Sequence, residues 1–455
     1  MDRLRRLWQG EQPYEPLEDS AAEADDHSQA TPRRSGFSYT EYSIFLLLGV
    51  SMLWAWNMFL AAGPYFQHRF AGNQWIVDNF QATEISVSTV TNLVAMLVLT
   101  RLQANASYPK RIVSSLIINM AIFAMLSLFT EAFLGISARG YFGFLITTVF
   151  FASLAAGLCQ NGIFAYVNGF GEPLYMQGIM TGQAVAGVLP CIAQIVSVLS
   201  VPDDNHQPPH GPPGDEAPAR GTPPVHASSA LAYFLTATVI SVITLLAFSY
   251  LLARNRQPKN LEDNTTPDTT NESDERKRVP IRVLFRKLFW PASAVFVTFG
   301  VTMVFPVFTQ RIVSVQPLVK QSRILQPPSF IPLAFLFWNS GDLVGRLLTA
   351  IPSLSLVHRP RLIFAFSVAR IGFVGLYHLC NIRDEGAVVK SDLFYLVVVQ
   401  LCFGLTNGYL GSTCMIGAGE WVEPEEREAA GGFMGLCLVG GLTVGSLASF
   451  FVTGA

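Results

Sequence analysis

Long apolar runs alternate with short polar segments along most of the chain. A helix needs about 20 apolar residues to cross the roughly 30 Å hydrocarbon core of a bilayer, and runs of this length recur throughout the sequence. Most of them begin or end at a cluster of charge, proline or glycine. We therefore expect transmembrane helices near residues 44–66, 82–104, 112–132, 141–167, 176–201, 229–253, 291–310, 329–352, 361–381, 392–416 and 429–452.

Two polar segments divide this pattern. Residues 1–40 are polar and acidic, and residues 254–288 mix acidic and basic side chains with serine and threonine and lack an apolar helical period. We expect a disordered cytosolic tail at 1–40, six helices in 41–253, a disordered cytosolic linker at 254–288 and five helices in 289–455. The predicted fold class is an all-α polytopic membrane protein with eleven transmembrane helices in a 6+5 arrangement.

The composition limits the classes of protein to which this chain can belong. The chain is 51% hydrophobic and only 14% charged, whereas about 25% of a soluble protein is charged. A net charge of −2 leaves no basic excess to attract nucleic acid, so nucleic-acid binding is excluded. The six cysteines lie in apolar runs without a CxxC pair, and the HExxH, GxSxG and Walker motifs are absent from the sequence. We expect neither an enzyme nor a metal or other cofactor.

Basic residues predict the orientation, because cytoplasmic connections retain lysine and arginine. Most of those outside the apolar runs fall in the N-terminal tail, in the connection at 101–111 and in the segment 254–287. These three regions lie on one side of the membrane if the helices alternate in direction. We therefore predict a cytosolic N-terminus, with the C-terminus on the opposite side.

A polar face interrupts the apolar run at 329–352. A charge at membrane depth costs about 2.5–3.5 kcal/mol on insertion scales, so it needs a partner or a water-filled cavity. Asn339, Asp342 and Arg346 follow one another at steps of three and four residues and share one helical face. A carboxylate and a guanidinium suit a polyhydroxylated ligand such as a sugar. The alternative is a structural ion pair that locks two helices together, and both roles can hold at once.

Other runs carry fewer polar groups. Trp56 beside Asn57 can stack on a planar ring or anchor the chain at the membrane interface, and Gln160 with Asn161 can bind a polar ligand or join helices. For Arg370 a structural role is favoured. Asp342 is the carboxylate that this pattern places near the middle of a span. A sparse polar lining within two sets of helices is what a secondary transporter needs, with its site near the midplane.

Several motifs, in order along the chain, make it resemble the equilibrative nucleoside transporters, and especially a fungal member. Trp56, Asn57 and Phe59, followed by Tyr65 and Phe66, are similar to the PWNxF…YF signature of that family, with Ala55 in place of the proline. The segment 178–187 is similar to its SGQGLAG motif. The other matching positions are Phe305, Pro306, Asp342, Gly345, Arg346, Arg370, Phe373, Cys380, Asn381, Thr406, Asn407, Gly408, Tyr409, Ala429, Ala430 and Gly431.

This resemblance implies a fold like that of the major facilitator superfamily with one helix missing, and a central cavity between the halves. It implies transport of purine and pyrimidine nucleosides, with Asp342 and Arg346 at the ribose hydroxyls and Asn339 beside them. The further substrate-binding positions that it implies are Gln160 at the base, Trp56 and Leu53 packed on the ligand, Leu60 where the family often has methionine, and Phe305 and Pro306 at the border of the cavity.

Rival interpretations remain. One rival is a sugar or drug transporter of the major facilitator superfamily, which carries a DxxGR motif in a cytosolic loop, whereas here the motif lies inside a span. The other is a membrane scaffold or receptor, which would gain nothing from intramembrane charge. Proton coupling needs a titratable group in the transport path, and Asp342 is next to Arg346, so we expect facilitated diffusion with a proton-coupled nucleoside carrier as the alternative.

The expected partners, oligomeric state and location follow from these interpretations. The expected partners are a nucleoside substrate and the lipid bilayer, and the protein is expected to be a monomer. The segment from Tyr14 to Leu17 fits the YxxΦ sorting pattern, which favours a vacuolar or other endomembrane location over the plasma membrane.

Overall fold

The structure is a computed structural model, and it describes residues 37–103, 106–132, 135–200, 227–256, 279–317 and 321–452. Residues 1–36 of the predicted tail, which include its sorting pattern, and most of the predicted linker lie outside these residues. Within the described ranges the chain is helical or irregular, apart from an isolated β-bridge between Ile312 and Ile382. The residues from Tyr39 onward belong to one compact unit.

Local sequence signals set the ends of the first-half helices. Asn73 caps α4 with a side-chain oxygen that accepts a hydrogen bond from the Ile76 backbone N–H at 3.4 Å. Gly171 ends α6 at φ 69°, a left-handed conformation that glycine adopts without a steric cost. The helices are α2 (Tyr39–Ala61), α3 (Gly63–Arg69), α4 (Gln74–Arg101), α5 (Tyr108–Glu131), α6 (Ala138–Phe170), α7 (Pro173–Ser200) and α8 (Ala227–Arg256).

In the second half, proline explains a break that matters for the site. Pro306 lacks the N–H that would bond the carbonyl of Thr302, four residues earlier, and α10 ends at Thr302. The elements are α9 (Ile281–Lys287), α10 (Phe289–Thr302), α11 (Val304–Thr309), α12 (Pro327–Leu348), α13 (Pro360–Ala369), α14 (Gly372–Tyr377), the π-helical η5 (Phe394–Leu401), α15 (Cys402–Gly417) and α16 (Arg427–Val452), with single 3-10 turns η3 (Arg323–Leu325), η4 (Pro352–Leu354), η6 (Ala418–Glu420) and η7 (Pro424–Glu426).

Ten helical segments of the described chain are long and apolar enough to cross a membrane. They coincide with ten of the eleven predicted runs. The remaining run falls on α12, which has 22 residues but is not among the ten. Asn339, Asp342 and Arg346 lower the hydropathy of this helix, so length and composition do not decide whether it spans, and the count of eleven stays a prediction.

The predicted disordered linker at 254–288 is helical at both ends, which corrects that expectation. α8 continues to Arg256, and α9 begins at Ile281. Leu284 and Leu288 are fully buried and belong to the main apolar core. A helix of seven residues is too short to show a clear apolar period, so only its packing against the core identifies it.

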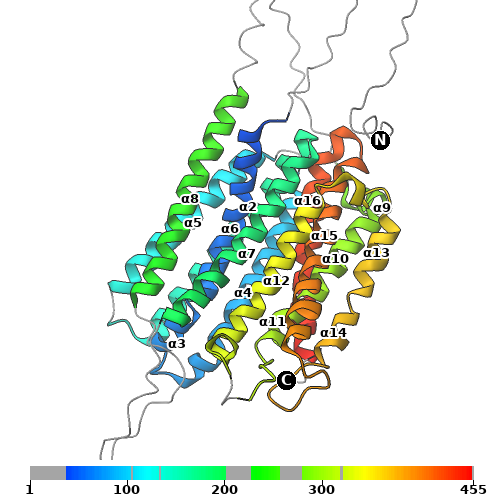
Figure 1. Cartoon of the computed structure of the whole chain (residues 1–455). Helices are drawn as coiled ribbons and strands as arrows, with labels where there is room; N and C mark the ends of the chain where they lie inside the picture. Colours follow the sequence, from blue (N-terminus) through cyan, green and yellow to red (C-terminus); the bar gives the residue numbers. More distant parts are fainter. Residues whose placement is uncertain are drawn as a thin grey trace, which may run out of the picture. The chain divides into compact units, whose positions relative to one another are not determined.

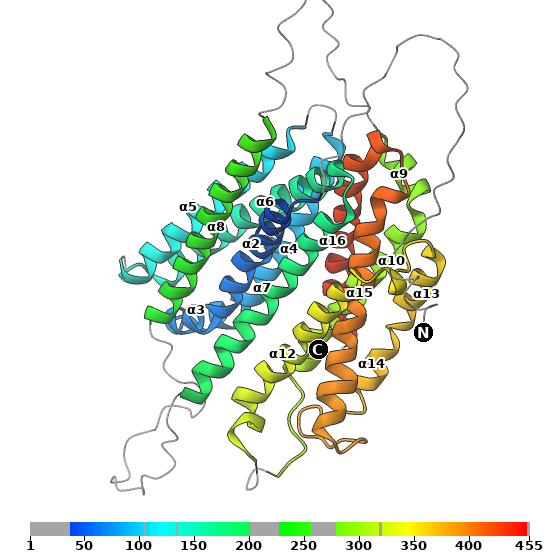
Figure 2. The same cartoon turned by 45° about the horizontal axis from the view of Figure 1, so that its top comes forward.

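Helices of the two halves meet along α7 and α12. Figure 1 colours the first-half helices from blue to green and the second-half helices from yellow-green to red, and α7 and α12 lie side by side in both views (Figures 1 and 2). α7 also packs on α2, and α12 packs on α15. A second junction forms where α16 packs on α6 and α4. The polar face of α12 therefore lies between neighbouring helices.

Candidate functional site

The predicted polar face of α12 forms an ion pair. The Arg346 Nε donates to the Asp342 Oδ2 at 2.7 Å, one helical turn apart. Both side chains are buried, with 3% of Asp342 and 5% of Arg346 exposed. Such a pair is stable away from water only where hydrogen bonds satisfy its remaining polar atoms.

Those bonds come from the neighbouring helices. The Asn407 Nδ2 of α15 donates to the Asp342 Oδ1 at 2.7 Å, and the Asn407 Oδ1 accepts from the Thr302 hydroxyl of α10 at 2.6 Å. Arg370, at the end of α13, donates to that hydroxyl oxygen at 3.2 Å and to the Thr298 carbonyl at 2.6 Å. We call this set the buried polar network: Asp342, Arg346, Asn407, Thr302, Thr298 and Arg370.

Arg346 also joins the network to the first half of the chain. Its Nη1 donates to the Met180 carbonyl of α7 at 2.7 Å and to the Gln183 Oε1 at 3.0 Å. The Gln183 amide nitrogen in turn lies 2.7 Å from the Met52 sulfur of α2. The arginine therefore links the halves, as the structural-lock interpretation requires.

Glycine permits these close approaches. A Cβ on Gly408 of α15 would collide with the carbonyl oxygen of Asp342. A Cβ on Gly187 of α7 would collide with the side-chain oxygen of Asn339. Larger residues at either position would separate the helices that hold the network together.

Asn339 belongs to α12, and Phe305 of α11 packs against the same helix. The Asn339 amide donates to the Phe335 carbonyl at 2.9 Å and lies 3.6 Å from the Cys191 sulfur of α7. Phe305 of α11 stacks on Trp338, with ring centroids 4.3 Å apart and planes at 14°. Pro306 follows it at the break after α10. These predicted residues line one continuous region of α11 and α12.

The predicted substrate-binding residues on α2 are more exposed than those on α12. Leu53 and Trp56 are half-buried, and Leu60 is 52% exposed. Asn57 joins α2 to α7 through a 2.7 Å hydrogen bond to the Ala186 carbonyl. This amide therefore has a structural partner, whereas the Trp56 ring retains an accessible surface.

Gln160 lies on α6, in a different polar group. Its side-chain oxygen accepts from Asn92 of α4 at 3.4 Å, and 8% of the residue is exposed. The adjacent Asn161 bonds Arg111 of α5 and the Thr100 hydroxyl of α4. Asn161 thus joins helices, and no hydrogen bond within the described residues connects Gln160 to the buried polar network.

Sequence reasoning missed the direct partners of the ion pair. Gln183 entered only as part of a glycine-rich motif, and Asn407 only as part of a family motif. Thr302 did not enter at all. A polar residue within each of three apolar runs was the available signal, but it does not reveal which runs are neighbours.

A second intramembrane carboxylate was also missed. α4 begins at Gln74, well before the predicted start at 82, so Glu84 lies inside the helix rather than at its end. Only 4% of Glu84 is exposed, and among the described residues its Oε1 has no hydrogen-bond partner. Asp342 is therefore not alone as a carboxylate within a span.

Chemically, the α12 region offers directed donors and acceptors in an apolar setting. Asp342 accepts from two donors, and a carboxylate has about four acceptor positions, so ligand hydroxyls can add to it or replace an internal donor. Within the described residues no group of three or more His, Cys, Asp or Glu side chains could hold a metal ion. The arrangement suits reversible binding of a polar ligand.

Comparison with known proteins gives the family. A sequence model described as nucleoside transporter matches residues 145–278 and 251–453. The chain is 28% identical to nucleoside transporter FUN26 of Saccharomyces cerevisiae over 92% of this chain and 85% of that protein. It is 24% identical to equilibrative nucleoside transporter 1 of Homo sapiens over 90% of this chain and 95% of that protein.

Solved structures agree on the fold. FucP, a Major Facilitator Superfamily transporter in the outward conformation, superimposes with a TM-score of 0.53 and 12% identity over 91% of this chain and 95% of its own. A bacterial homologue of the iron transporter ferroportin in an outward-facing state superimposes with a TM-score of 0.55 and 11% identity. That match covers 90% of this chain and 91% of the homologue. The predicted major-facilitator-like arrangement is confirmed. With the family model matching most of its length, the chain belongs to the equilibrative nucleoside transporter family.

Proposed function

We propose that this protein carries nucleosides across a membrane by facilitated alternating access, with the α12 polar face at the ribose. The observation that carries the proposal is the buried ion pair of Asp342 and Arg346, held between α7 and α15 in a nucleoside transporter chain. Ribose hydroxyls are donors and acceptors that match a carboxylate and a guanidinium. Binding of the sugar would loosen the link from Arg346 to α7 and let the halves move.

The aromatic and amide positions complete this proposed site. Trp56 and Leu53 would pack on the base, Gln160 would bond its edge, and Leu60, Phe305 and Pro306 would border the cavity. In this structure Gln160 lies in the α4–α6 polar group. A nucleoside that reaches both Gln160 and Asp342 would therefore bridge the two halves, which is what coupling of binding to rocking requires.

The orientation, oligomeric state and location of the protein are part of the same proposal. The N-terminal tail and the 254–288 segment would lie in the cytosol between six-helix and five-helix halves, and the protein would work as a monomer without catalytic activity. An endomembrane such as the vacuolar membrane is the proposed location. Protease accessibility of tags at the two chain ends in sealed vesicles tests this orientation.

Uptake of radiolabelled adenosine and uridine into proteoliposomes tests the transport proposal. Wild-type protein should give saturable uptake that equilibrates without a gradient, and Asp342→Asn should abolish it. Asp78→Asn is the matched control, since Asp78 is an exposed carboxylate at the start of α4. Folded wild-type protein that moves neither nucleoside would contradict the proposal and favour a sugar or drug carrier.

Glu84 favours one second candidate, a proton-coupled nucleoside carrier. A buried carboxyl oxygen without a partner is a group that can exchange a proton without breaking other bonds. An inward proton gradient should then drive uptake above equilibrium, and Glu84→Gln should abolish the overshoot while leaving exchange intact. An unchanged time course with and without the gradient rejects this candidate and leaves facilitated diffusion.

A further inference from the structure

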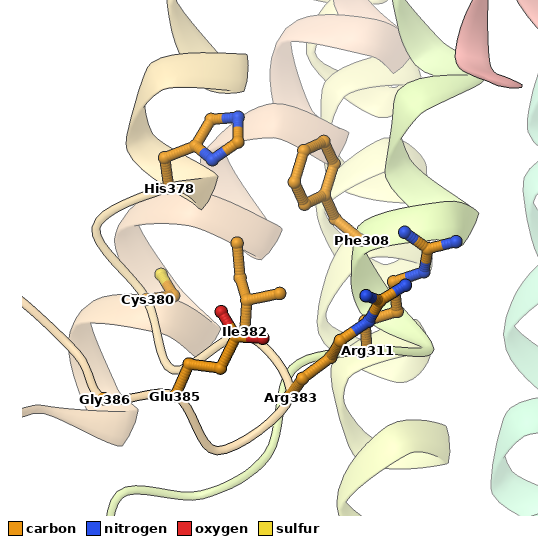
Figure 3. Close-up of a pocket in the computed structure, with 8 residues that line it drawn as sticks. All are labelled: Phe308, Arg311, His378, Cys380, Ile382, Arg383, Glu385 and Gly386. Carbon is orange, nitrogen blue, oxygen red and sulfur yellow. The ribbon is translucent and has the colours of Figure 1, made fainter. Parts of the chain in front are cut away.

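A pocket of about 320 Å³ lies between the end of α11 and the segment that follows α14. Figure 3 shows Arg311, Arg383 and Glu385 in its lining, and Asp384 stands between the last two in the sequence. Two carboxylates thus match the two guanidinium groups of this region.

The buried polar network differs, because its guanidinium groups outnumber its carboxylates. The Asp342 carboxylate pairs with Arg346. Arg370 brings a second guanidinium group, and only 2% of this residue is exposed. A charge away from water is costly unless neighbouring groups compensate it, so the partners of Arg370 decide what this second cation does.

Arg370 is bonded to neutral oxygens. Its Nη1 donates to the Thr298 carbonyl at 2.6 Å, and its Nη2 donates to the Thr302 hydroxyl at 3.2 Å. The Phe403 carbonyl, at 3.5 Å, and the Thr406 hydroxyl, at 3.2 Å, also accept from it. Its Cζ lies 4.6 Å from the centroid of the Phe403 ring, which is a cation–π contact. Within the described residues no carboxylate bonds this guanidinium group directly.

A chain of hydrogen bonds connects Arg370 to Asp342. The Thr302 hydroxyl has one proton and lies 2.6 Å from the Asn407 Oδ1 and 2.8 Å from the Thr298 carbonyl oxygen. Because Arg370 already donates to that carbonyl, the hydroxyl can donate to Asn407. The Asn407 Nδ2 then faces the Asp342 Oδ1 at 2.7 Å, whereas a reversed amide would set two oxygens against each other. The donors therefore all point from the guanidinium group toward the carboxylate.

The main elements packed against α12 bring no other charge to this carboxylate. α7, α11, α15 and η5 contain no Asp, Glu, Lys, Arg or His residue, and neither does α10. η3 carries Arg323, which donates to carbonyls at the C-terminal end of α7, about 24 Å along that helix from Gln183. Tyrosine and cysteine side chains are neutral at pH 7 and below. Arg346 and Arg370 are therefore the cations that can balance Asp342.

We propose that Arg370 is the second counter-charge of Asp342 in the ribose site. It acts through Thr302 and Asn407, so it is a positioning residue and does not itself touch the substrate. The proposal rests on the proposed function, in which ribose hydroxyls bond Asp342 and Arg346. When the Arg346 guanidinium turns to the sugar, a carboxylate without another cation would favour uptake of a proton. The polarised chain from Arg370 keeps the carboxylate ionised, as an acceptor for the ribose hydroxyls, without a coupled proton.

Uridine uptake into proteoliposomes with the same pH inside and outside tests this role. Thr302→Val keeps the shape of the side chain and both arginines, and it removes the hydroxyl that links the chain. From about pH 7.5 to about pH 5.5 the KM of the wild type should stay constant. The KM of Thr302→Val should rise by about tenfold over this range with little change in the maximal rate, because the carboxylate gains a proton. Thr302→Ser restores the hydroxyl and should restore the constant KM.

Thr309→Val is the matched control. Thr309 is also a buried threonine of the second half, and its hydroxyl accepts from Gln400 at 2.9 Å, outside the network. Its replacement should leave the KM independent of pH. Thr302→Val should add nothing to the effect of Asn407→Leu, since either change breaks the same chain. If Thr302→Val does not fold, Thr302→Ala carries the same test.

A KM of Thr302→Val that stays constant with pH overturns the proposal, as does an equal pH dependence in Thr309→Val. The melting temperature over the same pH range tests the chain without transport. It should fall further toward acid pH for Thr302→Val than for the wild type, because a protonated Asp342 no longer pairs with Arg346; an equal fall also overturns the proposal. Folded wild-type protein that takes up no uridine would contradict the proposed function, and the melting comparison would still decide the role of Arg370.

Discussion

Asp342 in α12 and Glu84 in α4 are both buried carboxylates within long helices, but their surroundings differ. Asp342 accepts hydrogen bonds from Arg346 and Asn407 and belongs to a network that reaches four other helices. Glu84 is as deeply buried, yet its Oε1 has no partner among the described residues. In the second half of the chain, several hydrogen bonds therefore hold the charged Asp342 in place. In the first half, Glu84 can gain or lose a proton without breaking a hydrogen-bond network.

Loss of Asp342 should have the largest effect. Asp342→Asn leaves the Arg346 charge buried without its counter-charge, which costs about 3–5 kcal/mol. We expect a strongly lowered melting temperature in detergent and an uptake rate at least about tenfold lower. The double variant Asp342→Leu with Arg346→Met should regain melting temperature, because an apolar pair can replace a buried ion pair. Recovery of uptake in that double variant would show that the pair is only a lock.

Separation of α12 from α15 should have the next largest effect. Gly408→Ala places a methyl group against the Asp342 carbonyl and should stretch the bond from Asn407, with a loss of about 1–3 kcal/mol in stability. The melting temperature and the maximal uptake rate should both fall. Gly372→Ala is the matched control, since nothing lies within 4 Å of its added Cβ. Equal behaviour of the two variants would show that the α12–α15 approach is not tight in the working protein.

Replacement of Glu84 should have a smaller effect on stability. Glu84→Gln keeps the shape of the side chain, and no hydrogen bond to Oε1 is lost, so stability should change by less than about 1 kcal/mol. Thermal melting beside Asp342→Asn measures the contrast between the two carboxylates. A loss as large as that of Asp342→Asn would show that Glu84 is held by partners after all and would remove the asymmetry.

Truncation of Leu60 should have the smallest effect on folding. Because 52% of this residue is exposed, Leu60→Ala removes little packing within the protein. If the side chain borders the proposed cavity, the KM for adenosine should rise by about fivefold, equivalent to about 1 kcal/mol of apolar contact. Concentration-dependent uptake measures this, with melting temperature as the control. An unchanged KM would place Leu60 against lipid instead.

Much of the fold was predictable because a membrane imposes it. The apolar runs matched ten helices, since every backbone group in a bilayer must be satisfied within its own helix. The errors arose where length or polarity weakened the signal. α9 is too short to show an apolar helical period. α4 extends beyond its apolar run at the N-terminal end, so Glu84 lies inside the helix.

The sequence by itself determined that α12 carries Asn339, Asp342 and Arg346 on one face, because helical spacing is local. It also determined the family through ordered motifs. Only the tertiary structure decided that Asn407, Thr302 and Gln183 complete the network. Those contacts join residues far apart in the chain, and they depend on which helices pack together and where glycine lets them approach.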